Sequence, residues 1–371
     1  MTNDPRDEAF MAAALALGRR NLGRAAPNPA VGALLVKNGV VIARGFTGAG
    51  GRPHGEAMAL AAAGARARGA TLYATLEPCS HHGETPPCAE AIIAAGVARV
   101  VSAMEDPDPR VAGRGHALLR EAGISVTSPV LERDARRAHL GHIRRLTERR
   151  PMVTLKLAQT PDGFAAGATH DPRLHVTGPL ADAFSHMQRA LHDAIMVGAA
   201  TAREDDPLMT VRLPGLEDEK RLRVVLDSKL SLSPRSRFAA LARKAPTLVI
   251  VARDVSDSAV AAFTEATGAE AARVETDMLG RVALPAALAE LARRGVTRVF
   301  CEGGPRLAES LICGGFADEV ILHTGEKPFG GAGRLALRPA ARATVMDERL
   351  YERVETTRLG PDTMVRHEKR A

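Results

Sequence analysis

Short apolar runs alternate with longer helical segments along almost the whole chain of 371 residues. The apolar runs lie at 30–45, 70–78, 98–106, 193–200, 222–228, 246–253, 296–304 and 318–325. The segments with helical character lie at 8–20, 54–69, 86–97, 112–126, 132–149, 180–192, 284–295 and 304–315. Because strands and helices that alternate in this way pack as layers, the pattern predicts an α/β protein whose sheets are covered by helices.

Two local signals refine this prediction. Asn38 and Gly39 interrupt the first apolar run, and an Asn-Gly pair between apolar runs is a strong signal for a β-hairpin. Pro151 ends the last helical segment of the first half, and a new apolar pattern begins after it. We therefore expect two domains, which the length also favours, at residues 1–148 and 149–371.

The chain carries a net charge of +7, which raises the question of an anionic partner. The densest basic clusters lie at 136–150 and 234–238, and neither is interleaved with aromatic side chains. Since a base-stacking surface needs such aromatics, we expect no nucleic-acid partner. A small phosphorylated substrate would instead account for a few specific arginines.

Other features concern the cellular location. No segment reaches the roughly 18 to 20 apolar residues of a membrane-spanning helix, so no membrane association is expected. The N-terminal segment has acidic residues where a secretory signal would be basic. The four cysteines are unevenly spaced, unlike a disulfide framework. These features predict a cytoplasmic protein, with Cys301 and Cys313 in the core because they lie in apolar runs.

Residues 54–88 contain a candidate metal site. His54, Cys79 and Cys88 offer an imidazole and two thiolates, a ligand set typical of zinc. Three protein ligands leave one tetrahedral position for water, as a catalytic zinc site requires. Glu56 follows His54 by two residues and is placed to move protons beside the metal; His-x-Glu followed by Pro-Cys is the zinc-deaminase pattern.

Two other interpretations stay open for these residues. His81 or His82 would close the site as a fourth ligand and make the zinc structural, although structural sites usually space their cysteines more closely than Cys79 and Cys88. Without metal, the two cysteines would be ordinary buried thiols.

Four segments of the first half resemble the deaminase half of the bifunctional riboflavin-biosynthesis deaminase/reductases. They are APNPAVGALLV, RPHGEAMAL, TLEPCSHHGETPPCAEAIIAAGVARVV and EDPDPRVAGRGHALLREAGI, within residues 8–145. The resemblance implies a cytidine-deaminase-like α/β/α sandwich. It also implies that one Zn²⁺ per chain is held by His54, Cys79 and Cys88, with Glu56 as the catalytic proton donor.

The sequence departs from that family at three positions. Thr47, Gly55 and Asp108 stand where the family usually has His, Ala and Asn. Because the implied zinc ligands and Glu56 are all present, these departures concern substrate contacts more than the chemistry.

The second half contains one pattern that fits a nucleotide site on its own. VFCEGGPRLAESL, residues 299–311, is typical of a strand, a Gly-Gly turn and a helix, and the backbone N–H groups at such a helix start bind phosphate. No G-x-G-x-x-G follows a strand, so a Rossmann domain is not indicated. A tight turn without any ligand would explain the same residues.

Further segments of the second half resemble the reductase half of the same family, which has a dihydrofolate-reductase-like α/β fold. They are RPMVTLKLAQTPDGFAAG, DAIMVGAATAREDDPLMTVR, RVVLDS and VFCEGGPRLAESLI. The resemblance implies an NADPH site lined by Ala158, His175, Thr201, Asp205, Ser228, Gly304, Pro305, Arg306 and Leu307. It implies a substrate site lined by Arg173, Arg189, Met209, Arg212 and Glu302.

Two positions of the reductase half depart from the family pattern, and one acidic pair has a second interpretation. Pro161 replaces the usual Leu of a Ser-Leu-Asp-Gly motif, and His175 stands where the family commonly has Trp. Asp205 and Asp206 would also fit a helix-ending turn before a proline.

The resemblance implies a bifunctional enzyme, a zinc-dependent hydrolase and an NADPH-dependent oxidoreductase. It would deaminate 2,5-diamino-6-(5-phosphoribosylamino)pyrimidin-4(3H)-one and then reduce the ribosyl side chain to give 5-amino-6-(5-phosphoribitylamino)uracil. Lys156 and Glu302 are candidates for orienting the sugar, and a homo-oligomer is expected. The alternatives are a nucleoside or tRNA deaminase fused to an unrelated reductase, and a non-catalytic RNA-binding or regulatory protein on a deaminase fold.

Overall fold

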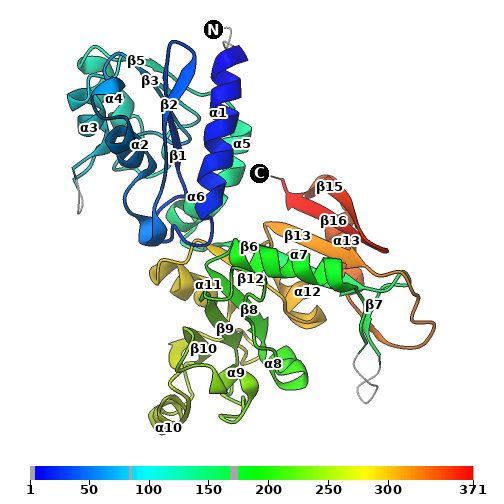
Figure 1. Cartoon of the computed structure of the whole chain (residues 1–371). Helices are drawn as coiled ribbons and strands as arrows, with labels where there is room; N and C mark the ends of the chain where they lie inside the picture. The colour runs from blue at the N-terminus through cyan, green and yellow to red at the C-terminus, as the bar shows by residue number, and fades with distance from the viewer. Residues whose placement is uncertain (1–4, 83–85, 168–173, 371) are drawn as a thin grey trace. The chain divides into compact units, whose positions relative to one another are not determined.

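The computed structural model describes residues 5–82, 86–167 and 174–370. The chain divides into two compact units, Met1–Arg149 and Arg150–Ala371 (Figure 1). Each unit has its own sheet with helices packed on it and its own hydrophobic core, which confirms the expected α/β class.

The first unit is built on a five-stranded sheet of order β2-β1-β3-β4-β5. Its strands are β1 (Gly32–Lys37), β2 (Val40–Phe46), β3 (Thr71–Ala74), β4 (Arg99–Ser102) and β5 (Ser125–Thr127). β1 pairs antiparallel with β2 and β3, while β3, β4 and β5 are parallel. Asn38 and Gly39 form the turn between β1 and β2 with φ of 51° and 76°, so the expected hairpin is confirmed.

Helices cover both faces of this sheet (Figure 1). They are α1 (Pro5–Gly18), α2 (Gly55–Ala63), α3 (Cys88–Ala94), α4 (Arg114–Glu121), α5 (Glu132–Ala138) and α6 (Leu140–Thr147), with 3-10 turns at Arg19–Asn21, Ala49–Gly51 and Gly64–Ala67. Leu35 of β1 belongs to the core cluster that includes α2, α3 and α4, whereas its neighbour Leu34 belongs to the cluster with α1 and α5. This alternation produces the expected α/β/α sandwich.

Two helix boundaries differ from the expectation. The segment 54–69 is α-helical only to Ala63, because Gly64 at φ 55° ends the helix and a 3-10 turn follows. The basic segment 132–149 forms two helices, α5 and α6. His139 separates them, and its buried ring hydrogen-bonds the backbone carbonyl and the hydroxyl of Thr75 at 3.1 Å.

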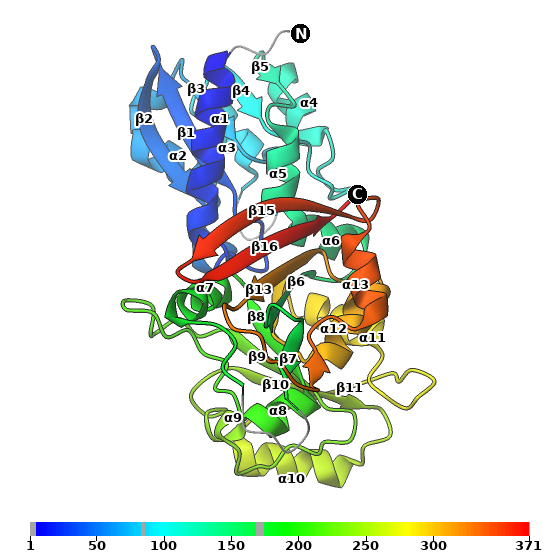
Figure 2. The ribbon, with the colours of Figure 1, turned by 90° about the vertical axis from the view of Figure 1, so that its right-hand side faces the viewer.

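The second unit is built on a nine-stranded sheet of order β11-β10-β9-β8-β12-β6-β13-β16-β15. Its strands are β6 (Met152–Gln159), β8 (Ala194–Gly198), β9 (Leu222–Leu226), β10 (Thr247–Ala252), β11 (Glu270–Val274), β12 (Arg298–Cys301), β13 (Glu319–Thr324), β15 (Tyr351–Leu359) and β16 (Asp362–Lys369). The strands from β11 to β13 are parallel, and the C-terminal hairpin of β15 and β16 continues the sheet in antiparallel fashion (Figure 2). A separate small sheet pairs β7 (Phe164–Ala166) with β14 (Arg334–Leu335).

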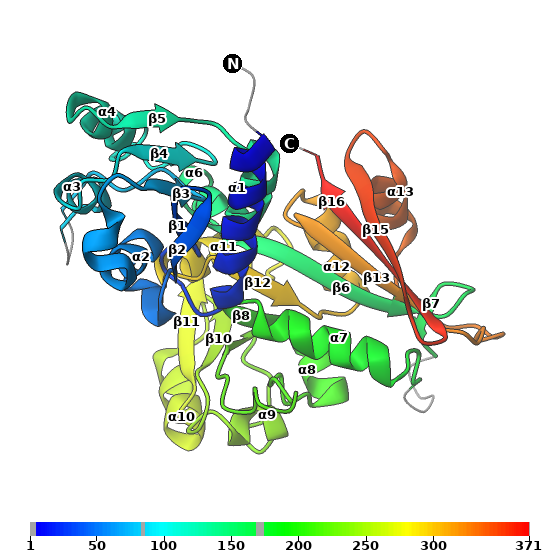
Figure 3. The same cartoon turned by 45° about the horizontal axis from the view of Figure 1, so that its top comes forward.

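Helices also lie on both faces of the larger sheet. They are α7 (Pro179–Ala190), α8 (Ala199–Asp205), α9 (Arg237–Ala240), α10 (Asp257–Thr267), α11 (Leu284–Arg293), α12 (Pro305–Cys313) and α13 (Pro339–Met346). One face packs against α11, α12 and α13, and the other against α8, α9 and α10. The helix α7 also lies on this second face of the sheet (Figure 3). Its Phe184 packs on Phe300 of β12, Ile321 of β13 and Met364 of β16.

The two cysteines outside the candidate metal site differ in their exposure. Cys301 is buried in β12, as expected, but Cys313 is exposed, so the prediction of a core position was wrong for it. Cys313 is the last residue of α12, where the apolar run leaves the buried face of the helix. Among the described residues, no helix combines the length and the apolar character needed to cross a bilayer.

Candidate active sites

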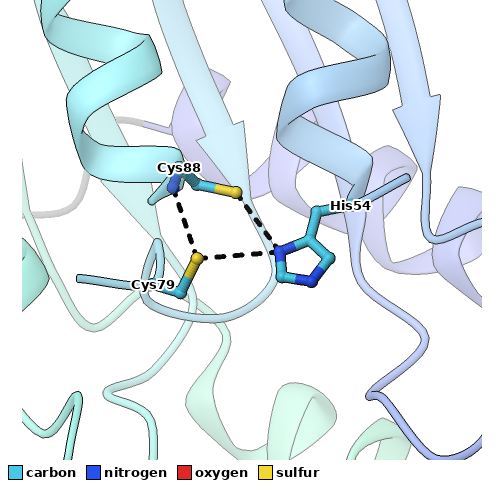
Figure 4. A group of neighbouring side chains, drawn as sticks. All are labelled: His54, Cys79 and Cys88. Atoms are coloured by element: carbon cyan, nitrogen blue, oxygen red, sulfur yellow. Dashed lines mark hydrogen bonds between the residues drawn. The ribbon is translucent and has the colours of Figure 1, made fainter. Parts of the chain in front are cut away.

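Three separate segments bring the predicted metal ligands together in the first unit (Figure 4). His54 is the N-cap of α2, Cys79 lies in the loop after β3, and Cys88 is the first residue of α3. The Nδ1 atom of His54 lies 3.6 Å from Sγ of Cys79 and 3.3 Å from Sγ of Cys88. The three ligand atoms all lie within 4.8 Å of one another, which is close enough for one ion to contact all three.

The residues around the three ligands are compatible with the expected open coordination position on the metal. Within the part of the chain that the structure describes, the group consists of His54, Cys79 and Cys88, with no fourth His, Cys or carboxylate. His82 is exposed and lies 3.7 Å from Glu90 instead. The arrangement therefore favours an open metal site over a closed one.

The two thiols interact closely with each other. The backbone N–H of Cys88 donates to Sγ of Cys79 at 3.3 Å. A hydrogen bond from the Cys88 thiol lowers the pKa of Cys79 to about 4, while the same bond and burial raise the pKa of Cys88. The surroundings of Cys79 thus favour the thiolate, the form in which cysteine binds metal.

Glu56 lies in the first turn of α2 and is only 3% exposed. Its Oε2 atom has no hydrogen-bond partner among the described residues. Burial raises the pKa of Glu56 to about 7; the charge of His54 opposes this rise and that of Cys79 adds to it. A buried carboxyl with an unused oxygen beside the three ligands suits a group that takes up and releases a proton.

The residues that depart from the family pattern have structural roles here. The buried hydroxyl of Thr47 donates to the carbonyl of Pro29 at 2.8 Å and accepts from the N–H of Val31 at 2.9 Å. A Cβ at Gly55 would lie 2.8 Å from the carbonyl oxygen of Val31, so the close packing of α2 on β1 favours glycine. Asp108 pairs with Arg110, with Nε and Oδ2 at 2.9 Å.

Glu77 supports the Cys79 loop and was not identified from the sequence. Its carboxylate is 2% exposed and accepts three backbone N–H groups. These come from Asp106 at 3.2 Å, Gly113 at 2.9 Å and His116 at 3.1 Å. Because Glu77 stands two residues before Cys79, these bonds fix the loop against the start of α4. In the sequence, only its place in the TLEPC motif could have pointed to Glu77.

Asn28 is a second residue that sequence reasoning did not single out. Its Nδ2 atom donates to the carbonyl of Gly51 at 2.9 Å and lies 3.5 Å from Nε2 of His54. It therefore stands on the side of the imidazole opposite the two sulfurs, where it orients the ring.

Several of the predicted cofactor residues lie at the carboxyl edge of the parallel strands in the second unit. Ala158 is in β6, Thr201 is in α8 after β8, and Ser228 follows β9. Thr201 accepts the N–H of Gly304 at 3.0 Å, which ties α8 to the start of α12. The hydroxyl of Ser228 already accepts the N–H of Val282 at 2.9 Å.

The Gly-Gly turn after β12 leads into α12. Gly304 is the N-cap, Pro305 opens the helix and Arg306 follows in its first turn. Leu307 points back onto the turn, because a Cβ built on Gly303 would lie 2.6 Å from its Cδ2 atom. A side chain at position 303 would therefore require Leu307, which covers the turn, to shift.

Two other predicted cofactor residues, Asp205 and His175, lie outside the Gly-Gly turn and the start of α12. Asp205 is the last residue of α8, and Asp206 caps the helix at φ 39°, so the helix-ending turn that this pair also suggested is present. His175 is exposed on the segment before α7.

The predicted substrate residues gather around α7. Arg189 donates to Glu302 through Nε and Nη2 at 2.8 and 3.0 Å, and through Nη1 to the carbonyl of Thr210 at 2.9 Å. Burial opposes the charge on Glu302, but Arg189 lowers its pKa below the usual value. Met209 is buried at φ 51°. Arg212 donates through Nη1 to the hydroxyl of Thr210 at 3.2 Å. Arg173 lies outside the described residues.

Both units match known family models. Residues 151–365 match the RibD C-terminal domain, and residues 4–104 match the cytidine and deoxycytidylate deaminase zinc-binding region. The chain is 35% identical to the riboflavin biosynthesis protein RibD of Escherichia coli (strain K12), over 96% of this chain and 97% of that protein. It is 37% identical to RibD of Aquifex aeolicus (strain VF5), over 87% of this chain and 88% of that protein.

Solved structures give the same result. RibD of Acinetobacter baumannii, form 1, superposes with a TM-score of 0.86 at 30% identity over 99% of both chains. A Thermotoga maritima protein superposes with a TM-score of 0.81 at 31% identity, over 98% of this chain and 99% of that one. That protein is described as a diaminohydroxyphosphoribosylaminopyrimidine deaminase/5-amino-6-(5-phosphoribosylamino)uracil reductase.

Proposed function

Because this chain belongs to the RibD family, the bifunctional deaminase/reductases of riboflavin biosynthesis, we propose its two substrates and the residues that act on them. The first unit deaminates 2,5-diamino-6-(5-phosphoribosylamino)pyrimidin-4(3H)-one. The second unit reduces the ribosyl side chain of that product to give 5-amino-6-(5-phosphoribitylamino)uracil. The description of the Thermotoga maritima relative supports both substrates.

In the deaminase step, His54, Cys79 and Cys88 hold zinc, and their convergence supports this assignment. Bound zinc supplies a water molecule whose pKa is lowered towards neutrality. Glu56 takes a proton from the attacking water and delivers it to the amino group that leaves ring carbon 2. Water is consumed and ammonia is released, so the ring atom gains a carbonyl oxygen.

In the reductase step, NADPH supplies the hydride. The start of α12, with Gly304 and the neighbouring Thr201, is proposed to bind the cofactor phosphates through backbone N–H groups. Arg212 is the better phosphate anchor for the substrate, because Glu302 and Thr210 already occupy most donors of Arg189. Lys156 and Glu302 orient the sugar chain.

The observation that carries the proposal is the convergence of His54, Cys79 and Cys88 beside buried Glu56. The test compares Cys88→Ser with a matched control, Cys313→Ser, whose thiol is exposed in the other unit. Zinc per chain, ammonia release and NADPH oxidation with the deaminated substrate are measured on the full chain. We expect Cys88→Ser to lose zinc and ammonia release while NADPH oxidation continues. Full zinc content with undiminished ammonia release would refute the ligand assignment.

The match of residues 151–365 argues against an unrelated reductase, which was the main alternative. The use of NADPH as the cofactor, the homo-oligomer and the cytoplasmic location stay predictions.

A further inference from the structure

His323 is a buried histidine that has no role in the reactions proposed above. It lies near the end of β13, and its side chain is 0% exposed. Neither Nδ1 nor Nε2 has a hydrogen-bond partner in the described part of the chain. Burying two polar ring atoms without partners is unfavourable, so such a group calls for an explanation, such as a bound ligand.

The described side chains around His323 provide no such partner. Its register neighbours are Ala158 on β6 and Met364 on β16. On the α7 side, the Phe184 ring meets the imidazole edge-on, with ring centroids 5.5 Å apart. These apolar groups hold the imidazole in place and satisfy neither of its nitrogens.

The same face of the sheet carries the residues proposed to orient the sugar. Lys156 is the register partner of Ile321, two residues before His323, and Glu302 follows β12 on the other side of β6. The charges of Lys156 and Glu302 both act on His323. The ring therefore lies on the face of the sheet that carries Lys156, within the influence of the charges of Lys156 and Glu302.

The charge state of His323 restricts the kind of ligand it fits. Burial, reinforced by Lys156, lowers the pKa of His323 to about 4, so the ring is neutral at pH 7. A neutral imidazole has one N–H donor and one acceptor nitrogen. That pair suits hydroxyl groups, whereas a phosphate group would favour a cationic partner.

The position in the sheet separates this site from the proposed cofactor phosphates. Thr201, Ser228 and the start of α12 follow β8, β9 and β12, which lie on one side of β6. His323 lies on β13, on the other side of β6. Ala158, between them on β6, would then mark the place where cofactor and sugar meet.

We propose that His323 is a substrate-binding residue of the reductase unit, which hydrogen-bonds hydroxyl groups of the ribosyl chain and selects for a polyhydroxylated substrate. This inference rests on the proposed function, because it names the part of the same reductase substrate that the second unit recognises.

The test uses two variants of similar size and shape in the full chain. His323→Asn keeps one donor and one acceptor, and His323→Leu removes both. For each, kcat and KM are measured for the deaminated phosphoribosyl substrate at saturating NADPH, and the Kd of NADPH alone is measured by fluorescence. Ammonia release by the first unit and the NADPH Kd report whether the chain is folded.

We expect His323→Leu to lower kcat/KM for the sugar substrate by about 10- to 100-fold, mainly through KM, since the hydroxyls lose their partners. His323→Asn should stay within about 5-fold of the parent, and both variants should bind NADPH as the parent does.

Three results would overturn the inference: unchanged kcat/KM in His323→Leu, equal losses in both variants, or a loss confined to NADPH binding. If His323→Leu fails to fold, His323→Phe replaces it, because it keeps a ring against Phe184 and removes both nitrogens. A parent chain that never oxidises NADPH with this substrate would refute the proposed reductase function itself.

Discussion

Replacing Glu77 by alanine tests whether this buried carboxylate holds the metal loop in place. The carboxylate accepts backbone N–H groups of Asp106, Gly113 and His116. Alanine leaves these three donors without their acceptor, and Gln keeps the size of the side chain but replaces one oxygen by an NH₂ group.

The expected loss follows from those three bonds. A buried donor left unpaired destabilises a fold by about 1 to 3 kcal/mol, so the loss of three acceptor contacts in Glu77→Ala should lower the free energy of unfolding of the first unit by roughly 3 to 9 kcal/mol. Glu77→Gln should lower it by about half as much, because one oxygen still accepts. The loop also carries Cys79, and zinc affinity should fall by about 10- to 100-fold in Glu77→Ala.

Tyrosine fluorescence can follow the first unit alone. The chain has no Trp and two Tyr, so a Tyr351→Phe background leaves Tyr73 as its single tyrosine. Tyr73 is buried in β3 and donates to Asp7 at 2.7 Å, a contact that unfolding removes. With a urea m-value of about 1 to 3 kcal/mol/M, a loss in the middle of the expected range should lower the urea midpoint by about 3 M.

Glu90→Ala is the matched control, because Glu90 is an exposed glutamate of the same unit. The reasoning is refuted if Glu77→Ala unfolds at the same urea concentration as Glu90→Ala, or if both bind zinc with equal affinity in a chelator competition.

Three further predictions concern the two sites and the acid stability of the first unit. Glu56→Gln should keep one zinc per chain while ammonia release falls by about 10²- to 10⁴-fold; loss of the metal would show instead that Glu56 is a ligand. Arg212→Ala should raise the reductase KM for the phosphorylated substrate but not for its dephosphorylated analogue, and equal changes for both would contradict a phosphate contact. Burial lowers the pKa of His139 to about 4, below the value of about 6.5 expected for the unfolded chain, so the unfolded state binds more protons between these values. The stability of the first unit should therefore decline by roughly 3 kcal/mol as the pH falls from 6.5 to 4, and His139→Gln, followed through Tyr73, should show a flatter profile.

The metal cluster was predictable because its signals are local. His54 and Cys88 each stand at the start of a helix, and the glycine-ended and proline-started segments around them predict those helices from the sequence alone. The Asn38-Gly39 turn likewise specifies the register of the first hairpin. Alternating strands and helices pack as layers, so the α/β class could be predicted from the order of these local elements alone.

Other features depend on tertiary contacts that no local pattern contains. The strands of the C-terminal hairpin are rich in charged residues, so β15 and β16 lack the apolar runs that marked the other strands. The role of Glu77 appears only when the loops at Asp106 and Gly113 fold back onto it. His323 sits in the apolar run VILHTG and has the pattern of a core residue until its neighbours are known.

The place of β12 in the larger sheet affects how the second unit is made. β12 lies between β8 and β6, yet it leaves the ribosome about a hundred residues after β8. Until then the facing edges of β6 and β8 have no permanent partner, and open edges of this kind pair readily with other chains. During its synthesis this unit therefore passes through a stage with open strand edges, whereas the strands of the first unit are complete before β6 is translated.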